Sequence, residues 1–575
     1  MIDCWGIALF LAGTPIFLFD NPQYFSIFVP LNVNQYNRTL MSRFFAIAAA
    51  LFAAVAVSAQ SAATVIIPRP VEAVSLKGSY IVGEKCVIRT AEQSLVRPAE
   101  IFAGYVAGEE GLSLAVEQSG KHGGITLSLD AALAKEEYRL TITSKGVVIK
   151  GSTPQGVFYG LQSLRQLLSA AEKCKKGYEL QGVDITDKPL LGHRGAMLDV
   201  GRYFFTVAEV KRFIDIAAMH KLNIFHWHLT EDQGWRIEIK KYPNLTKIGS
   251  KREQTIMGRN SISKTYDGTP HGGYYTQEEI RDIVAYAAER YIEVVPEIDM
   301  PGHMVAALAS YNHLGCRDEK FKVRTRWGIS KDVLCAGKET TFEFVEGVLS
   351  EVISLFPSKY IHLGGDEAPR NRWKECPHCQ KRIKEEGLKD ENELQSYFMH
   401  RVEKFLAERG RKIIGWDEII YGGINKSATI MLWNDRNRAK ATSLGNDVIL
   451  TPKYFCYMDY YQTTRPYSNK EGLMFRDERI LTLRKAYSLN PYEGMQPSEY
   501  GRIRGVQANL WTEYIPNFHR AQEKLLPRLA ATAEAGWSSG KKDFEDFTRR
   551  INHLRRLYDK AGLHYATYFF DGVDE

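Results

Sequence analysis

Eight short apolar segments, most of them separated by stretches with helical patterning, constrain the fold of this chain more than any other feature. They lie at residues 194–200, 223–230, 292–299, 360–367, 412–418, 428–434, 447–451 and 505–511. Residues 206–221 and 276–291 combine a Thr-x-x-Glu capping box with the apolar spacing of amphipathic helices. Strands that alternate with helices form parallel sheets, and eight such units close into a barrel. We therefore predict an α/β protein in which residues 186–575 form a (β/α)8 TIM barrel.

A small α+β domain is predicted before the barrel, at residues 62–185. Residues 138–143 and 147–150 alternate apolar and polar side chains, which is the pattern of antiparallel strands with one buried face. Residues 155–168 have apolar side chains at helical spacing. Nothing in this domain indicates chemistry of its own.

The first 60 residues have the pattern of a processed N-terminus. Residues 41–59 contain one Arg, an apolar core that is short for a membrane span, and a small-residue ending before Gln60. This is the pattern of a secretory signal peptide. We expect Met41 to be the start and residues 1–40 to be an upstream extension. The alternative is a membrane anchor formed by this apolar region, so membrane association is expected only through the N-terminal segment. A signal peptide predicts export to the periplasm or the cell surface.

The composition excludes some classes of partner. The formal net charge is +7 over 575 residues, and the sequence has no run of Lys and Arg of the kind that binds nucleic acid. Hydrophobic residues make up 44% and charged residues 25%, as in ordinary globular proteins. We therefore expect no nucleic-acid partner.

The eight cysteines are too few and too scattered for a disulfide scaffold. Cys376-Pro-His-Cys379 could be half of a zinc site, but a structural zinc needs four ligands and no second CxxC or His pair occurs. A local disulfide or free thiols in a loop is the expectation, and Cys316 could also pair with Cys335. We expect neither a metal nor another cofactor.

The carboxyl ends of the predicted strands collect charged and aromatic residues. Because the strands of a barrel are parallel, these ends share one mouth, which is where barrel enzymes place their chemistry. The residues are Asp199, Arg202, His226, His228, Glu231, Asp232, Glu297, His303, Asp366, Glu367, Trp416, Asp417, Glu418, Trp433, Tyr457, Asp459, Trp511 and Glu513, with Arg194 at the start of the first strand. Trp side chains stack on sugar rings and carboxylates accept bonds from hydroxyls, so the set indicates a sugar site.

Each of these residues also has a simpler interpretation. Asp366-Glu367 alone would be an acidic turn, and each Trp alone would be a core residue. His226 and His228 share one face of a strand and could bind a metal, although satisfied core histidines are more common. Arg194 could be a buried partner of Asp199.

Several motifs in order make the barrel resemble the β-N-acetylhexosaminidases of glycoside hydrolase family 20. The matching pieces are Arg194-Gly-x-x-Leu-Asp199, His226-Trp-His-Leu-Thr-Glu-Asp-Gln233, Glu297-Ile-Asp-Met-Pro-Gly-His303, His362-Leu-Gly-Gly-Asp-Glu367, Trp416, Trp433, Tyr457-Met-Asp459 and Leu510-Trp-x-Glu513. The resemblance covers roughly residues 185–545, and the preceding domain is also similar to that family's N-terminal domain. Glu231 departs from the pattern, which often has Asp there.

The resemblance implies a substrate-assisted reaction, in which the 2-acetamido group of the sugar attacks its own anomeric carbon. Glu367 would be the general acid and base, and Asp366 would hold the acetamido N–H. Tyr457 would orient the acetamido oxygen. The walls of the pocket would be Trp416, Trp433 and Trp511.

The resemblance also implies a relay from Asp232 through His303 to Glu367, and a grip on the terminal sugar by Arg194, Asp459 and Glu513. These roles describe a retaining exo-enzyme that removes terminal GlcNAc or GalNAc, with N-acetylhexosamine-terminated glycans as partners. The alternatives are a lacto-N-biosidase, which releases a disaccharide, and a sugar-binding barrel without catalysis.

Overall fold

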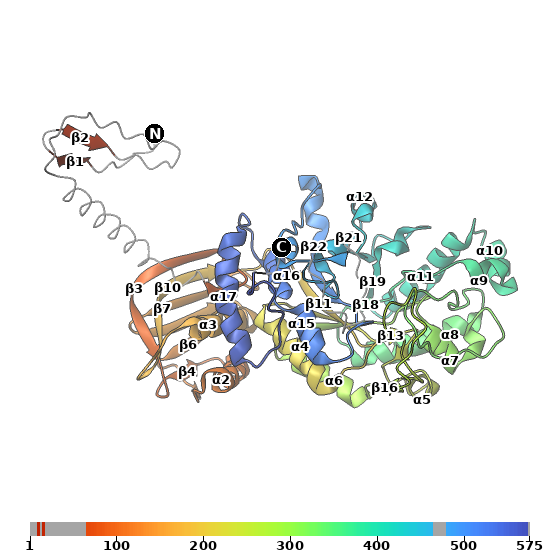
Figure 1. Ribbon diagram of the computed structural model, residues 1–575, viewed down its shortest axis with the longest axis horizontal. Helices are drawn as coiled ribbons and strands as arrows, with labels where there is room; N and C mark the ends of the chain where they lie inside the picture. Colours follow the sequence, from red (N-terminus) through yellow and green to blue (C-terminus); the bar gives the residue numbers. More distant parts are fainter. Residues whose placement is uncertain (1–7, 12–13, 18–64, 464–478, 573–575) are drawn as a thin grey trace. The chain divides into compact units, whose positions relative to one another are not determined.

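The computed structural model of the protein describes residues 8–11, 14–17, 65–463 and 479–572 (Figure 1). The chain divides into two compact units, residues 1–60 and 61–575. In the first unit, β1 (Ala8–Leu11) and β2 (Thr14–Phe17) pair antiparallel. The predicted signal peptide at 41–59 and most of the predicted extension at 1–40 lie outside the described residues. Within the described residues, every helix is too short or too polar to cross a bilayer.

The N-terminal domain of the second unit is a mixed sheet with helices on one face. Its strands are β3 (Glu72–Val82), β4 (Val87–Thr90), β5 (Ala115–Gln118), β6 (Ile125–Leu129), β7 (Tyr138–Thr143), β8 (Gly146–Gly151), β9 (Lys173–Cys174) and β10 (Gly177–Asp187). Their order is β3-β10-β7-β8-β6-β4-β5, with β9 beside β10. The predicted antiparallel strands are β7 and β8, whereas β4, β5, β6 and β8 pair parallel. The α+β character is confirmed.

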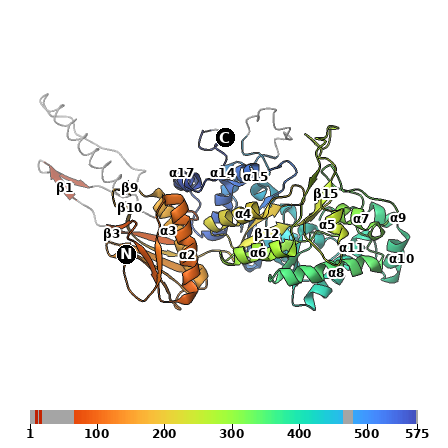
Figure 2. The same ribbon diagram turned by 90° about the horizontal axis from the view of Figure 1, so that it is seen from below.

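Helix α3 (Pro154–Ala170) is the predicted helix of this domain, and it lies beside α2 (Val96–Glu110) (Figure 2). Thr153 caps α3 by accepting a bond from the Gly156 amide. Almost every residue of α3 is buried, because the helix packs between the sheet and α17 (Phe544–Lys560), the last helix of the barrel domain. A helix that is covered on both sides joins the two domains into one body.

The predicted barrel is confirmed as a closed ring of eight parallel strands. The strands are β11 (His193–Asp199), β12 (Ile224–His228), β17 (Glu293–Glu297), β18 (Tyr360–His362), β19 (Lys412–Trp416), β20 (Thr429–Leu432), β21 (Asp447–Leu450) and β22 (Ile503–Leu510). Each overlaps its predicted segment. β18 is the shortest because Gly364 and Gly365 follow it with φ of +63° and +92°, which turns the chain out of the sheet.

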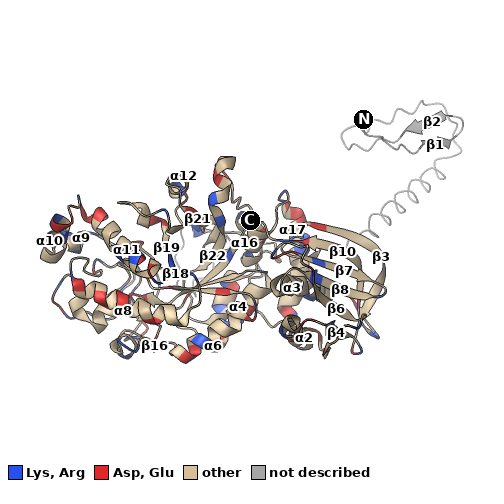
Figure 3. Cartoon of the chain, turned by 180° about the vertical axis from the view of Figure 1, so that it is seen from behind, with Lys and Arg blue, Asp and Glu red and all other residues tan. Residues whose placement is uncertain are grey.

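Helices surround the barrel and begin where the capping signals predict. The longer ones are α4 (Val207–Met219), α6 (Gln277–Ala288), α8 (Glu339–Leu355), α11 (Glu391–Ala407) and α16 (Arg528–Trp537). Shorter ones are α5 (Asn244–Lys247), α7 (Val305–Ser310), α9 (Asn371–Glu375), α10 (Pro377–Glu385), α12 (Arg438–Ser443), α13 (Lys453–Cys456), α14 (Leu483–Tyr487) and α15 (Phe518–Leu525). Both capping boxes, at Thr206 and Thr276, are formed. Acidic and basic residues are interspersed along the helices of both domains (Figure 3).

The cysteines confirm the free-thiol alternative. Cys316, Cys335, Cys376 and Cys379 are all free, so the suggested pairing of Cys316 with Cys335 is not formed, and Cys379 lies in α10 rather than in a loop. Their sulfur atoms lie within 4.8 Å of one another. The sequence suggested only half of a site because the other two cysteines come from a distant part of the chain, on the loop that follows α7.

Candidate active site

The turn after β18 carries Asp366 and Glu367 at the carboxyl end of the barrel. Glycine is required before them: a Cβ on Gly364 would lie 1.8 Å from Asp299 Oδ1, and a Cβ on Gly365 would lie 2.4 Å from Ile419. Glu367 itself has φ of +42°, which is a strained conformation for a residue with a side chain. Its amide donates to Glu418 Oε2 at 2.9 Å, which holds the turn in place. The fold thus presents two adjacent acids from a rigid turn.

His303 lies between these two acids and a third carboxylate. Its Nε2 is 3.7 Å from Glu367 Oε2 and 3.9 Å from Asp366 Oδ2. Its Nδ1 is 2.7 Å from Glu231 Oε1. Glu231 is therefore the carboxylate in direct contact with His303, whereas an oxygen of Asp232, the residue predicted to do this, lies within 4.8 Å of a ring nitrogen of His303.

Asp232 has a different position from the one that the resemblance implied. Its Oδ2 accepts from Arg324 at 2.8 Å, and its Oδ1 accepts from the Val305 amide at 3.0 Å. Adjacent residues point in different directions on an extended segment, so the one-residue choice between Glu231 and Asp232 decides which of them meets His303. Asp232 holds the loop that carries Arg324 against the start of α7.

Burial and charge separate the proton affinities of these groups. Burial opposes the charged form of His303, but the nearby carboxylates of Glu231, Asp299 and Asp366 together outweigh it, and the pKa of His303 is raised well above its usual value. Burial raises the pKa of Asp366 to about 7; nearby Glu367 raises it further, while His303 opposes the rise. Burial, followed by the charge of Asp366, raises the pKa of Asp299 well above its usual range. Acids whose proton affinities differ in one buried cluster are typical of general acid–base sites.

Four aromatic side chains predicted at the site come together as one group. The ring centroids of Trp416 and Trp511 are 5.7 Å apart, those of Trp511 and Tyr457 are 6.2 Å apart, and those of Tyr457 and Trp433 are 6.5 Å apart. The indole nitrogens of Trp433 and Trp511 are buried without a hydrogen-bond partner among the described residues. Aromatic faces with unpaired donors can stack on a sugar and bond its polar substituents.

The layer beneath this aromatic group fixes Trp416. Trp416 Nε1 donates to Glu297 Oε1 at 2.8 Å. His226 Nε2 lies 2.9 Å from Glu297 Oε2, and His228 Nδ1 lies 2.5 Å from the same oxygen. All of these side chains are buried inside the barrel. His226 and His228 are thus located as core histidines that hold a buried carboxylate.

Polar groups line the same end of the barrel. Asp459 Oδ1 and Asp366 Oδ1 are buried without a hydrogen-bond partner among the described residues. Burial raises the pKa of Asp459 to about 7, and the nearby Glu513 carboxylate adds to the shift. Burial also raises the pKa of Glu513, although Arg202 opposes it. Unpaired buried acceptors are costly in a folded protein, and hydroxyl or amide donors of a ligand would satisfy them.

Arg202 was not assigned a role from the sequence, but it lies among the carboxylates and aromatic rings of this site. Its Nη1 donates to Asp199 Oδ2 at 3.3 Å, its Nη2 lies 2.6 Å from Glu231 Oε1, and its guanidinium lies 4.9 Å from the Trp511 ring centroid. Arg202 follows the carboxyl end of β11, which is the signal that could have identified it.

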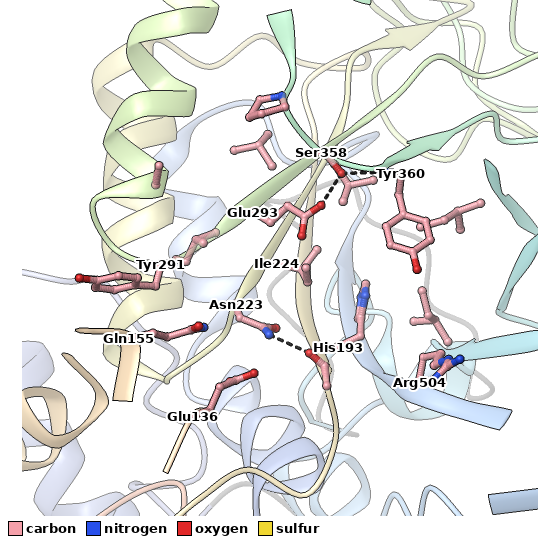
Figure 4. A pocket seen from close by; sticks show the side chains of 18 of the residues that line it. Glu136, Gln155, His193, Asn223, Ile224, Tyr291, Glu293, Ser358, Tyr360 and Arg504 are labelled. Atoms are coloured by element: carbon pink, nitrogen blue, oxygen red, sulfur yellow. Dashed lines mark hydrogen bonds between the residues drawn. The ribbon is translucent and has the colours of Figure 1, made fainter. Parts of the chain in front are cut away.

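The prediction that Arg194 grips the substrate is wrong. Arg194 is fully buried at the amino end of β11, and five residues of extended strand, roughly 16 Å, separate it from Asp199. Its guanidinium donates to Glu136 at 2.6 Å and to the Tyr159 hydroxyl at 2.9 Å, both in the N-terminal domain. Glu136 lines a cavity of about 830 Å³ at this end of the barrel, together with His193 (Figure 4). Arg194 joins the two domains.

The two arginines provide a matched test of these assignments. We expect Arg202→Lys to lower kcat/KM by about 100-fold, because one ammonium cannot replace a guanidinium that bridges two acids over an aromatic ring. Arg194→Lys should leave kcat/KM within about three-fold and lower the melting temperature, because its contacts are between domains. Steady-state kinetics and thermal unfolding of both variants measure this. A large loss of kcat/KM in Arg194→Lys but not in Arg202→Lys would show that Arg194, and not Arg202, binds the substrate.

Comparison with known proteins matches both domains to one enzyme family. The family model "Glycosyl hydrolase family 20, catalytic domain" matches residues 191–540, and "Glycosyl hydrolase family 20, domain 2" matches residues 63–188. A beta-hexosaminidase of Porphyromonas gingivalis is 44% identical over 87% of this chain. The chain spans 64% of that relative's length. A beta-hexosaminidase of Akkermansia muciniphila is 36% identical over 74% of this chain and 84% of its own.

Solved structures are similar over most of the chain. An exo beta-N-acetylglucosaminidase from Vibrio harveyi in complex with N-acetylglucosamine has a TM-score of 0.78 at 31% identity, and the match covers 88% of this chain and 78% of that one. A beta-N-acetylhexosaminidase from Bacteroides fragilis has a TM-score of 0.74 at 33% identity, covering 87% and 97%.

Proposed function

The chain belongs to glycosyl hydrolase family 20, and on this premise we propose that it is a retaining exo-β-N-acetylhexosaminidase. Its substrates would be glycans that end in GlcNAc or GalNAc at the non-reducing end. The observation that carries the proposal is the placement of His303 within 4 Å of both Asp366 and Glu367, beside an aromatic group with unpaired polar atoms. This arrangement would bring proton transfer and sugar binding together at the carboxyl end of the barrel.

Each group has a part in the proposed reaction. The 2-acetamido oxygen of the substrate attacks the anomeric carbon, the glycosidic bond breaks, and Glu367 protonates the leaving oxygen. Asp366 accepts the acetamido N–H and stabilises the positive charge that develops on the oxazolinium-like intermediate. Glu367 then removes a proton from the water that opens this intermediate. The attack is intramolecular, so binding the sugar in the correct conformation removes much of the entropic cost.

The residues around the acids position the substrate and the acid that transfers the proton. Tyr457 orients the acetamido oxygen, and Trp416, Trp433 and Trp511 enclose the acetamido group and exclude water. Arg202, Asp459 and Glu513 bind the hydroxyls of the terminal sugar, which closes one end of the pocket and gives exo-cleavage. His303, whose charged form the Glu231 carboxylate favours, lies 3.7 Å from Glu367 and positions its carboxyl group for both roles.

A panel of aryl β-glycosides tests this proposal. We expect rapid hydrolysis of the N-acetylglucosaminide or of the N-acetylgalactosaminide, which differ only at C4, and at least a 10³-fold lower kcat/KM for the plain glucoside. The glucoside lacks the internal nucleophile. Release of a disaccharide from a lacto-N-biose glycoside, with no release of the monosaccharide, would identify a lacto-N-biosidase instead. Binding of all sugars without turnover would indicate a non-catalytic sugar-binding barrel.

We propose that the chain is exported to the periplasm or the cell surface. The pattern of residues 41–59 in the sequence supports this proposal. Amino-terminal sequencing of the mature protein checks it: the expected first residue is Gln60, and a mature chain that retains residues 41–59 would contradict it.

A further inference from the structure

We propose that Cys316, Cys335, Cys376 and Cys379 bind one structural Zn²⁺ ion, at a site that takes no part in the proposed reaction. The four side chains come from two separate parts of the chain. Cys316 and Cys335 lie on the long loop between α7 and α8, whereas Cys376 precedes α10 and Cys379 lies in its first turn. The four sulfur atoms all lie within 4.8 Å of one another.

The distances between the sulfur atoms fit a tetrahedral zinc site. A Zn–S bond of about 2.3 Å gives a tetrahedron with edges of about 3.8 Å. Cys335 Sγ is 3.7 Å from Cys376 Sγ and 3.6 Å from Cys379 Sγ, and Cys379 Sγ is 3.8 Å from Cys316 Sγ. Cys379 is thus nearly equidistant from two different cysteines, and none of these three distances approaches the roughly 2.0 Å of a disulfide bond. This is the geometry of four ligands around one centre rather than of two disulfides.

The surroundings of the sulfur atoms are those of a closed structural site. Cys335 and Cys379 are fully buried and Cys376 is 2% exposed, whereas Cys316 lies at the edge. The loop of Cys335 is fixed by its own amide, which donates to Leu314 O at 2.8 Å, and by Trp373 Nε1, which donates to Leu334 O at 2.9 Å. Structural zinc sites use four protein ligands and leave no open position.

The backbone around the cysteines allows the segments that carry them to approach closely. A Cβ on Gly337 would lie 2.2 Å from the carbonyl carbon of His378, so only glycine lets the Cys335 loop approach the start of α10. Lys338 Nζ donates to Gly315 O at 2.7 Å, and Arg382 donates to Gly337 O at 3.4 Å. These bonds tie the segments that carry Cys316, Cys335 and Cys379 to one another.

The site would connect the two loops that carry the acid–base groups. The amide of Leu334, next to Cys335, donates to Pro301 O at 2.9 Å, two residues before His303. α9 and α10 follow the turn of Asp366 and Glu367. Zinc would thus fix the loop after β17 to the loop after β18 without touching substrate. Because metal binds the folded chain only when all four ligands are assembled, its binding free energy adds to folding stability.

Metal analysis of the full chain tests the inference. The protein is produced in zinc-supplemented medium, purified without chelators and analysed by inductively coupled plasma mass spectrometry. We expect about one zinc per chain. Cys335→Ser should reduce the zinc content at least five-fold, and Cys86→Ser, a buried cysteine of the N-terminal domain, should leave it unchanged. Equal zinc content in Cys335→Ser and the wild type would overturn the assignment.

A measurement on the wild type separates loss of zinc from loss of folding. Titration with a mercurial reagent in the presence of a zinc-sensitive dye should release the zinc as the cysteines react. A separate untreated sample, denatured without reductant, should have the intact mass of a fully reduced protein. Wild-type protein with less than about 0.1 zinc per chain, with iron in place of zinc, or with disulfides among these cysteines would contradict the proposal.

Discussion

Glu367→Gln should lower kcat/KM for a natural β-N-acetylhexosaminide by about 10³-fold, with KM changed by only a few-fold. The amide keeps the size and position of the side chain but cannot donate a proton to the leaving oxygen. The side chain is 35% exposed and its Oε2 lies 3.7 Å from His303 Nε2, so it can reach both a substrate and the group that positions it. Steady-state kinetics measure the loss.

The leaving group provides the internal control for this variant. An activated aryl glycoside needs little help from an acid, so Glu367→Gln should lose much less on it than on a disaccharide. Glu545→Gln, an exposed position on α17, should behave as the wild type with both substrates. An equal loss on activated and natural substrates would show that Glu367 is not the acid.

Asp366→Asn should lower kcat by about 10²- to 10³-fold while KM changes by a few-fold. The negative charge of Asp366 matters most when the acetamido nitrogen becomes positive, which happens only on the way to the intermediate. Binding of the neutral sugar depends on the aromatic group and on the hydroxyl contacts, which the substitution leaves in place. If Asp366→Asn weakened substrate binding and lowered kcat by the same factor, Asp366 would not have the proposed charge-stabilising role.

The pH dependence of kcat/KM should also depend on Asp366. Burial raises the pKa of Asp366 to about 7, so its carboxylate takes up a proton as pH falls through neutrality. The acidic limb of the wild-type kcat/KM profile should therefore have its midpoint near pH 7, with kcat/KM falling as the pH decreases through it. In Asp366→Asn this acidic limb should flatten, because no proton can bind at that position.

Much of the barrel could be predicted because local signals and the global fold agree. The Thr206 and Thr276 capping boxes mark helix starts, and the apolar segments between them are long enough to identify as strands. Gly364-Gly365 before two acids is also visible in the sequence as a glycine turn, although the side chains that exclude a Cβ there, Asp299 and Ile419, are distant in the chain. The capping and strand signals depend on residues close together in the chain.

The errors concern contacts that depend on tertiary structure. Arg194 and Arg202 flank the same strand; the strand direction that the barrel implies favours Arg202, and the substrate role of Arg194 came from the family resemblance alone. The choice between Glu231 and Asp232 depends on the position of His303, which comes from another strand. The cysteine cluster joins two loops that are distant in sequence, so neither half has the spacing of a complete metal site. Direction and packing, rather than residue type, were the missing information.

Inhibition by a thiazoline mimic of the oxazolinium-like intermediate tests most directly whether the sugar supplies its own nucleophile. The fused ring reproduces the intermediate that Asp366, Tyr457 and the three Trp side chains are proposed to stabilise. We predict that it binds at least 100-fold more tightly than N-acetylglucosamine, as intermediate analogues do, and that Asp366→Asn removes most of this advantage. Equal affinity for the thiazoline and for the simple N-acetyl sugar, measured as competitive inhibition constants at the same pH, would contradict the mechanism.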